Sequence, residues 1–96
     1  MSTGFECAFF KISKQRTFDY GAGVQKTLKP GWYYMLQNWT CPIGVTWYSD
    51  ATTYGPFDTN ETARDHLGST QPNPGGWCTY ENPSEDFLRA AAFNKP

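Results

Sequence analysis

The sequence predicts an α+β fold, because strand patterns fill most of its first half and two helix-start signatures follow them. The clearest strand is Gly31–Gln37, a run of rings and apolar side chains typical of β-strands. The two helix starts are capping patterns that begin at Asp58 and at Asn82. At 96 residues the chain has room for one core, so we expect a single α+β domain over residues 1–96.

Alternation of side chains between two faces predicts a mainly antiparallel sheet of four to five strands. The expected strands are 5–12, 17–20, 31–37, 45–50 and 77–81. Gly21 and Gly23 end the second strand, since glycine loses much backbone freedom inside a strand, and residues 25–30 then form a polar connection. The strands 31–37 and 45–50 are expected to pair as a hairpin.

The first helix is expected after Tyr54-Gly-Pro-Phe57, which breaks the strand pattern. Asp58 can cap this helix, and Glu61 three residues later can reach back to it as the second half of a capping box. We expect the helix to end at Gly68. Its apolar edge consists of two residues at i, i+4: Ala63 and Leu67.

The second helix is expected to begin at Asn82-Pro83-Ser84-Glu85, with Asn82 as its cap and Pro83 at its first position. Glu85 and Arg89 can form an ion pair at i, i+4 on its polar side. Its apolar side holds the residues expected to dock on the sheet: Phe87, Leu88 and Ala91. Helices this short can cover only one face of the sheet, and we expect both on the same face.

Charge is low and unevenly distributed along the chain. Residues 1–48 hold five cations and two anions, a net charge of +3, whereas residues 49–96 hold three cations and seven anions, a net charge of -4. The overall net charge of -1 argues against a protein that coats nucleic acid or an anionic membrane. The asymmetry is most simply a solvated surface, although it could steer a charged partner.

Neither a metal site nor a disulfide framework is predicted. The three cysteines are Cys7, Cys41 and Cys78; they form no C-x-x-C pair, and His66 is the only histidine that could join them as a ligand. The odd cysteine number and the absence of an export signal favour a reduced, cytoplasmic protein. We expect no metal, no cofactor and no membrane association.

The sequence also predicts no catalytic residues. A general acid or base would most simply be His66, but its helix position makes it a half-exposed surface residue. A Cys–His nucleophile pair has no support from spacing. The paired carboxylates of Asp58 and Glu61 are explained by capping, so we expect a protein that is not an enzyme.

Aromatic residues make up 18% of the chain, more than one small core was expected to bury. If both helices cover the face that holds Leu36, the other face of the sheet exposes a large apolar surface to solvent. The predicted partner-binding residues on it and beside it are Phe9, Lys11, Tyr33, Met35, Trp39, Tyr48 and Trp77. The alternatives are a different strand register, or a loop such as 68–76 that folds over this face.

The segment 54–67, Tyr-Gly-Pro-Phe-Asp-Thr-Asn-Glu-Thr-Ala-Arg-Asp-His-Leu, resembles an element of the SPOR family. In these peptidoglycan-glycan-binding domains a strand ends in Gly-Pro-Phe, and the following helix places Ala and Leu on the sheet. The resemblance implies a glycan-binding module with an internal repeat and an export signal or membrane anchor, neither of which the sequence displays.

The whole chain resembles the small aromatic-rich proteins encoded by bacteriophages, through its Gly-Trp-Tyr-Tyr strand and its Asn-Pro-Gly-Gly-Trp turn. This resemblance implies an accessory factor that occludes a host or anti-phage defence protein inside an infected bacterium, or that decorates a virion. Two further functions stay open. Aromatic rings on a sheet can stack on single-stranded nucleic acid or glycan, and the same rings could bury a second copy of the chain as a homo-oligomer.

Overall fold

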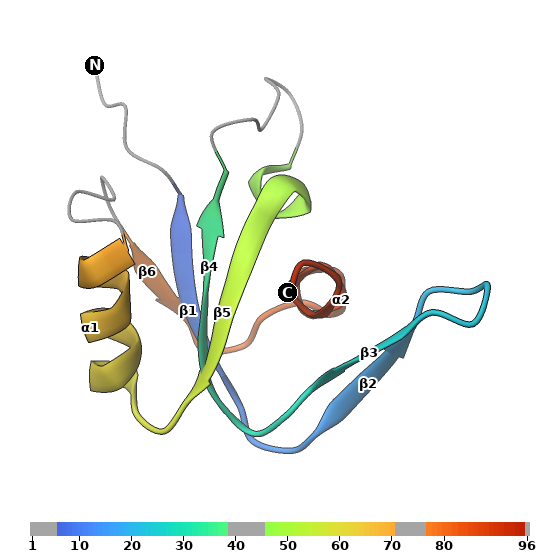
Figure 1. The fold of residues 1–96 in the computed structure, drawn as a ribbon, viewed down its shortest axis with the longest axis horizontal. Coiled ribbons are helices and arrows are strands. Elements are labelled where there is room, and N and C mark those ends of the chain that lie inside the picture. Colours follow the sequence, from blue (N-terminus) through green and yellow to red (C-terminus); the bar gives the residue numbers. More distant parts are fainter. Residues whose placement is uncertain (1–5, 39–45, 71–76, 96) are drawn as a thin grey trace.

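The computed structural model describes residues 6–38, 46–70 and 77–95 and confirms the predicted α+β class (Figure 1). Six strands, two α-helices and one 3-10 helix follow one another along these residues. The strands are β1 Cys7–Ile12, β2 Arg16–Asp19, β3 Gln25–Leu28, β4 Gly31–Gln37, β5 Ala51–Phe57 and β6 Cys78–Tyr80. The helices are η1 Trp47–Asp50, α1 Asn60–Thr70 and α2 Glu85–Phe93.

Four strands form the central sheet, in the order β5-β4-β1-β6. The β4 strand runs antiparallel to both β1 and β5, whereas β6 runs parallel to β1. Two of the three pairings are therefore antiparallel, as expected. The parallel pairing of β6 requires a long crossover, and α1 lies within it.

The strands β2 and β3 form a separate two-stranded ribbon that extends the β1–β4 hairpin beyond a bend. Ile12 pairs with Gly31 at the end of one ladder, and Arg16 pairs with Leu28 at the start of the next. Three residues, 13–15, therefore face two residues, 29–30, which is the arrangement of a β-bulge and bends the strands. We call this bend the elbow.

Residues 25–30 were predicted to be a polar connection, and the formation of β3 over Gln25–Leu28 contradicts that prediction. In the turn that joins β2 to β3, the Tyr20 backbone N–H donates to the Val24 carbonyl and the Val24 N–H donates to the Gly21 carbonyl, each at 2.9 Å. Gly21 and Gly23 of this turn have positive φ angles. The glycines therefore reverse the chain and permit β3 to pair, because glycine adopts these φ angles without steric cost.

Helix α2 lies between the central sheet and the β2–β3 ribbon (Figure 1). Its predicted docking residues Phe87, Leu88 and Ala91 are all buried, which confirms that prediction. The largest apolar cluster forms around them from both arms of the bent hairpin: Ala8, Phe10, Ile12, Phe18, Leu28, Tyr33 and Met35. The helix is thus enclosed by the elbow.

Helix α1 covers the opposite face of the sheet, so the prediction that both helices share one face was wrong (Figure 1). Its buried residues Ala63 and Leu67 pack against a second cluster: Cys7, Phe9, Tyr34 and Leu36. The physical reason is that β1 and β4 are apolar on both faces, since four consecutive residues of each strand are buried. Each face of such a sheet needs its own cover.

The strand that pairs with β4 on the side opposite β1 also differs from the prediction. The predicted strand at 45–50 is the 3-10 helix Trp47–Asp50 over its described residues, and β5 begins only at Ala51. The Tyr54–Phe57 segment does not break the strand, because β5 is an edge strand, where proline costs no ladder hydrogen bond. Gly55 allows the chain to pass closely over the Tyr33 ring, where a Cβ atom would lie 2.6 Å from the ring.

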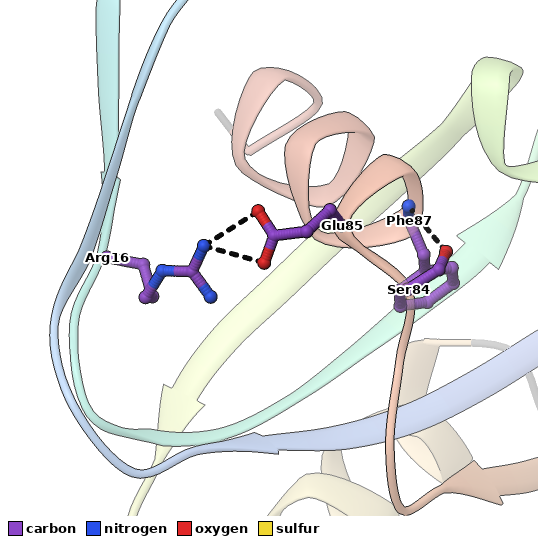
Figure 2. A network of polar contacts seen from close by, with 4 residues as sticks. All are labelled: Arg16, Ser84, Glu85 and Phe87. Carbon is purple, nitrogen blue, oxygen red and sulfur yellow. Dashed lines mark hydrogen bonds and ion pairs between the residues drawn. The ribbon is translucent and has the colours of Figure 1, made fainter.

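Both helices begin later than the capping patterns predict. Thr59, not Asp58, accepts a hydrogen bond from the Thr62 backbone N–H of α1, at 3.1 Å. The α1 helix continues through Gly68 to Thr70. In α2 the cap is the Ser84 side chain, which accepts from the Phe87 backbone N–H at 3.1 Å (Figure 2).

The predicted Glu85–Arg89 ion pair is replaced by contacts to the ribbon. Glu85 accepts two hydrogen bonds from the Arg16 guanidinium, at 2.7 and 2.8 Å (Figure 2). Arg89 donates to the Asp19 backbone carbonyl and stacks over the Tyr20 ring. The polar side of α2 therefore faces the ribbon and not only solvent.

These contacts rank the residues that stabilise α2. Truncation of a buried leucine costs about 2–5 kcal/mol, whereas loss of a serine cap costs about 0.5–2 kcal/mol. We expect Leu88→Ala to lower the free energy of unfolding in urea more than Ser84→Ala, and Asn82→Ala to have little effect. A loss from Asn82→Ala as large as that from Ser84→Ala would contradict the assigned cap.

Candidate functional site

The predicted partner-binding residues do not form one open face. Phe9, Tyr33 and Met35 are each 0% exposed, so their prediction as surface residues was wrong. The reason is register: Phe9 pairs with Tyr34, not Tyr33, and each of the two faces is covered by a helix. Trp39 lies outside the described residues.

The other three predicted residues reach the surface at separate places. Lys11 is exposed near the elbow, Tyr48 is half-buried beside α2, and Trp77 is 47% exposed on the α1 side. The Arg64 guanidinium lies 4.4 Å from the centre of the Trp77 ring, and the Phe9 ring meets it edge-on. Trp77 is thus already engaged on two sides within the chain.

A groove of about 520 Å³ lies along α2, between the 3-10 helix and the turn of the ribbon. We call it the α2 groove. Three rings from three separate elements line it: Tyr20 follows β2, Tyr48 belongs to η1, and Phe93 ends α2. The remaining side chains at the groove are polar or small: Thr46, Ser49, Asp86, Arg89, Ala90 and Asn94.

The walls of the α2 groove are held by contacts among themselves. The Tyr20 ring meets Phe93 edge-on at 5.1 Å between centres, and its hydroxyl donates to the Arg89 backbone carbonyl. The Asn94 side chain donates to the Tyr48 backbone carbonyl at 3.0 Å. Tyrosine is protonated at neutral pH, and partial burial raises the pKa of Tyr20 further above its ordinary value of 10.0, so the hydroxyl can donate this bond. The groove is therefore preorganised.

The two charged side chains of the α2 groove, Arg89 and Asp86, differ in the contacts that they make within the chain. Arg89 is bound to the Asp19 carbonyl and stacked 4.7 Å from the centre of the Tyr20 ring. Asp86 is exposed in the first turn of α2 and, within the described part of the chain, makes no ion pair. Asp86 is thus available to a positively charged group that enters the groove.

A polar contact surrounded by aromatic rings joins α1 to the sheet. The Tyr34 hydroxyl and His66 Nδ1 are hydrogen-bonded at 2.6 Å, and the rings of Tyr54 and Phe57 lie 5.3 and 5.1 Å from the His66 ring. His66 is half-buried, as expected, but its bond to a buried tyrosine could not be predicted from the α1 sequence. The arrangement fixes α1 on the sheet.

One of the described cysteines, Cys7, is buried in the cluster beneath α1. Burial, reinforced by the nearby Cys78, raises the pKa of Cys7 to about 12, which keeps its thiol protonated and unreactive at neutral pH. No three His, Cys, Asp or Glu side chains in the described residues are grouped closely enough to hold a metal ion. None of the helices over the described ranges is long and apolar enough to cross a membrane.

The chain matches no protein-family model, and no curated protein or solved structure is significantly similar to it. The SPOR and bacteriophage resemblances therefore stay predictions, and the case for a function depends on the geometry of the α2 groove.

The Tyr34–His66 bond predicts a measurable coupling. Removal of His66 leaves the hydroxyl of the buried Tyr34 without this partner, at a cost of about 1–3 kcal/mol, whereas removal of both groups avoids that penalty. We expect Tyr34→Phe and His66→Ala to be non-additive in a double-mutant cycle of urea unfolding. Tyr54→Phe, with His66→Ala, serves as the control cycle and should be additive; equal coupling in both cycles would contradict a specific bond.

The buried Cys7 and Tyr34 predict a loss of stability at alkaline pH. Burial raises the pKa of Cys7 from 9.0, and that of Tyr34 from 10.0, in each case to about 12. Because the folded state holds both protons more tightly than the unfolded chain, their contribution is fully present below about pH 9 and declines as the pH rises toward 12. We expect Cys7→Ala to show a smaller loss of unfolding free energy than the unmodified chain between about pH 8 and about pH 10.

The control for this experiment is Cys78→Ala, which removes an exposed thiol. This variant should lose nearly as much stability as the unmodified chain over the same interval. An identical loss in Cys7→Ala and the unmodified chain would show that the Cys7 thiol does not contribute.

Proposed function

We propose that the chain is a non-enzymatic binding protein that contacts a protein partner through the α2 groove. One observation carries this proposal: rings from three separate elements meet around a preorganised hollow, and Phe93 at its rim is 54% exposed. Tyrosine side chains, with tryptophan and arginine, are the residues that dominate the energetics of protein interfaces. A rim ring of this exposure is more readily covered by another protein than by an enclosed small molecule.

The charge of the α2 groove narrows the kind of partner segment that fits. Asp86 is available for an ion pair, whereas Arg89 is already engaged with the ribbon. A lysine or arginine of the partner can place its charged end at Asp86 while its aliphatic stem covers the rings. The groove therefore favours a basic side chain on the partner surface.

The resemblance to bacteriophage proteins supports a biological setting for this contact. In that setting the partner is a host or anti-phage defence protein, and binding inhibits or modulates it in the cytoplasm of an infected bacterium. The groove supports such a role because occlusion needs only complementary contact and no bound cofactor.

The earlier alternatives have less support from the described residues. Stacking of nucleic acid or glycan was expected on an open aromatic sheet face, but α1 and α2 cover the two faces. Self-association and virion decoration would use the same exposed rings as the proposed contact. The molecule that binds distinguishes these two alternatives from the proposed contact: a second copy of the chain for self-association, or a virion protein for decoration.

The test is site-specific photo-crosslinking in a bacterial lysate. A photoreactive residue at Phe93 should crosslink to a discrete protein, and excess unmodified chain should prevent this. Asp86→Lys should weaken the crosslink because it repels a basic partner group. The matched control is a photoreactive residue at Asp65, which is exposed on α1, on the other face of the sheet from the groove.

Two outcomes would contradict the proposal. Crosslinks that are the same at Phe93 and Asp65, or absent from a folded variant, would show that the groove is not a specific interface. A crosslinked dimer of the chain as the only product would replace the proposed partner with a second copy.

A further inference from the structure

We propose a second binding site, independent of the α2 groove, for an anion that carries a phosphate group. It is a pocket of about 380 Å³ at the elbow, between the 13–15 connection and the segment that leads into α2. We call it the elbow pocket. Its principal lining residues are Lys11, Ser13, Lys14, Arg16, Asn82 and Leu88.

Positive charge exceeds negative charge at the elbow pocket. Lys11 and Lys14 are exposed and make no ion pair within the described part of the chain, while Glu81 is the single acidic side chain that lines the pocket. The third cation, Arg16, is held by Glu85, so it borders the pocket in a fixed position (Figure 2). An anion bound in this pocket would be attracted by both lysines.

The fold brings these cations together from sequence positions that have different structural roles. Lys11 is the one exposed residue of β1, whose other five residues are buried. Lys14 lies in the three-residue side of the bulge that forms the elbow. A straight hairpin would lack that extra residue, so the bend and the lysine pair arise from the same feature.

The other lining groups indicate the chemistry of the anion. Ser13 and Asn82 add a hydroxyl and an amide donor from two segments far apart in the sequence. Hydroxyl, amide and ammonium donors from two separate segments can surround a tetrahedral oxyanion more completely than a planar carboxylate. The buried side chains of Ile12 and Leu88 form an apolar part of the lining, which can contact a compact organic group attached to the phosphate.

The elbow pocket shares no lining residue with the α2 groove. Failure of the protein-binding proposal would therefore leave this inference intact, and failure of this inference would leave the groove untouched.

The experiment is an NMR titration of the ¹⁵N-labelled chain with phenyl phosphate, inorganic phosphate and benzoate at constant ionic strength. We expect saturable shifts of the Ser13, Lys14 and Asn82 amides, with phenyl phosphate the tightest of the three. The double variant Lys11→Gln with Lys14→Gln should weaken phenyl phosphate about tenfold or more, as expected when charged hydrogen-bond donors are removed. The control, Lys26→Gln with Lys95→Gln, removes the same charge elsewhere and should leave the affinity unchanged.

Three results would overturn the proposal. Shifts that do not saturate, or equal weakening in the two double variants, would show general charge screening and no site. Benzoate that binds as tightly as phenyl phosphate would show that the pocket does not select phosphate. Because Lys11 and Lys14 are exposed, the variants should melt as the unmodified chain does, and the single Lys14→Gln variant provides the same test with a smaller perturbation.

Discussion

The Phe87 ring is the contact on which the arrangement of this protein depends. It meets Phe10 of β1 edge-on at 5.2 Å and Tyr80 of β6 at 4.9 Å between ring centres. It also contacts Tyr48 and Trp47 of the 3-10 helix, at 5.3 and 6.1 Å. One side chain of α2 therefore joins a central strand, an edge strand and the segment before β5. Together with the Asn94 hydrogen bond to the Tyr48 carbonyl, this contact positions Tyr48 at the α2 groove.

Rings allow a chain of this size to build two apolar clusters on one four-stranded sheet. A domain of fewer than 100 residues buries a smaller fraction of its surface than a larger one, and large rings supply much apolar area per residue. Tyr33 stacks on Phe10 in the α2 cluster, and Tyr34 stacks on Tyr54 in the α1 cluster. Their hydroxyls are satisfied by the Lys29 carbonyl and by His66. The rings that looked surplus in the sequence are thus largely core.

This distribution explains which parts of the fold could be predicted from sequence. Residue composition and periodicity within one element are local properties, so β1, β2, β4, β6 and the buried side of α2 were identified. Which residues of two paired strands lie on the same face of the sheet depends on the pairing register, and the sequence of one strand does not determine that register. Phe9 was grouped with Tyr33, although it pairs with Tyr34 on the other face. Similarly, β3 was missed because its few polar residues pair only once the glycine turn has formed.

The candidate sites were only partly accessible to the same reasoning. Two of the seven predicted partner-binding residues lie at a candidate site: Tyr48 in the α2 groove and Lys11 in the elbow pocket. The other five are buried, lie elsewhere on the surface or fall outside the described residues. Tyr20, Arg89 and Phe93 were missed because the ribbon and α2 meet across about 70 residues of sequence. The sequence suggested that Arg89 pairs with Glu85 within α2, and nothing in that local spacing indicates that its side chain reaches the ribbon.

The two sites lie at opposite ends of one contact, between α2 and the ribbon. Arg16 binds Glu85 near the elbow, whereas Tyr20 and Arg89 meet near the ribbon turn. Ion pairs exposed as this one is contribute about 0–1 kcal/mol, so the buried Phe18 and Leu28 must supply most of the attraction that holds the ribbon on α2. The polar contacts then set its position along the helix. The packing of these two apolar side chains therefore sets the distance between the ribbon and α2, which together form one side of the groove and one side of the pocket.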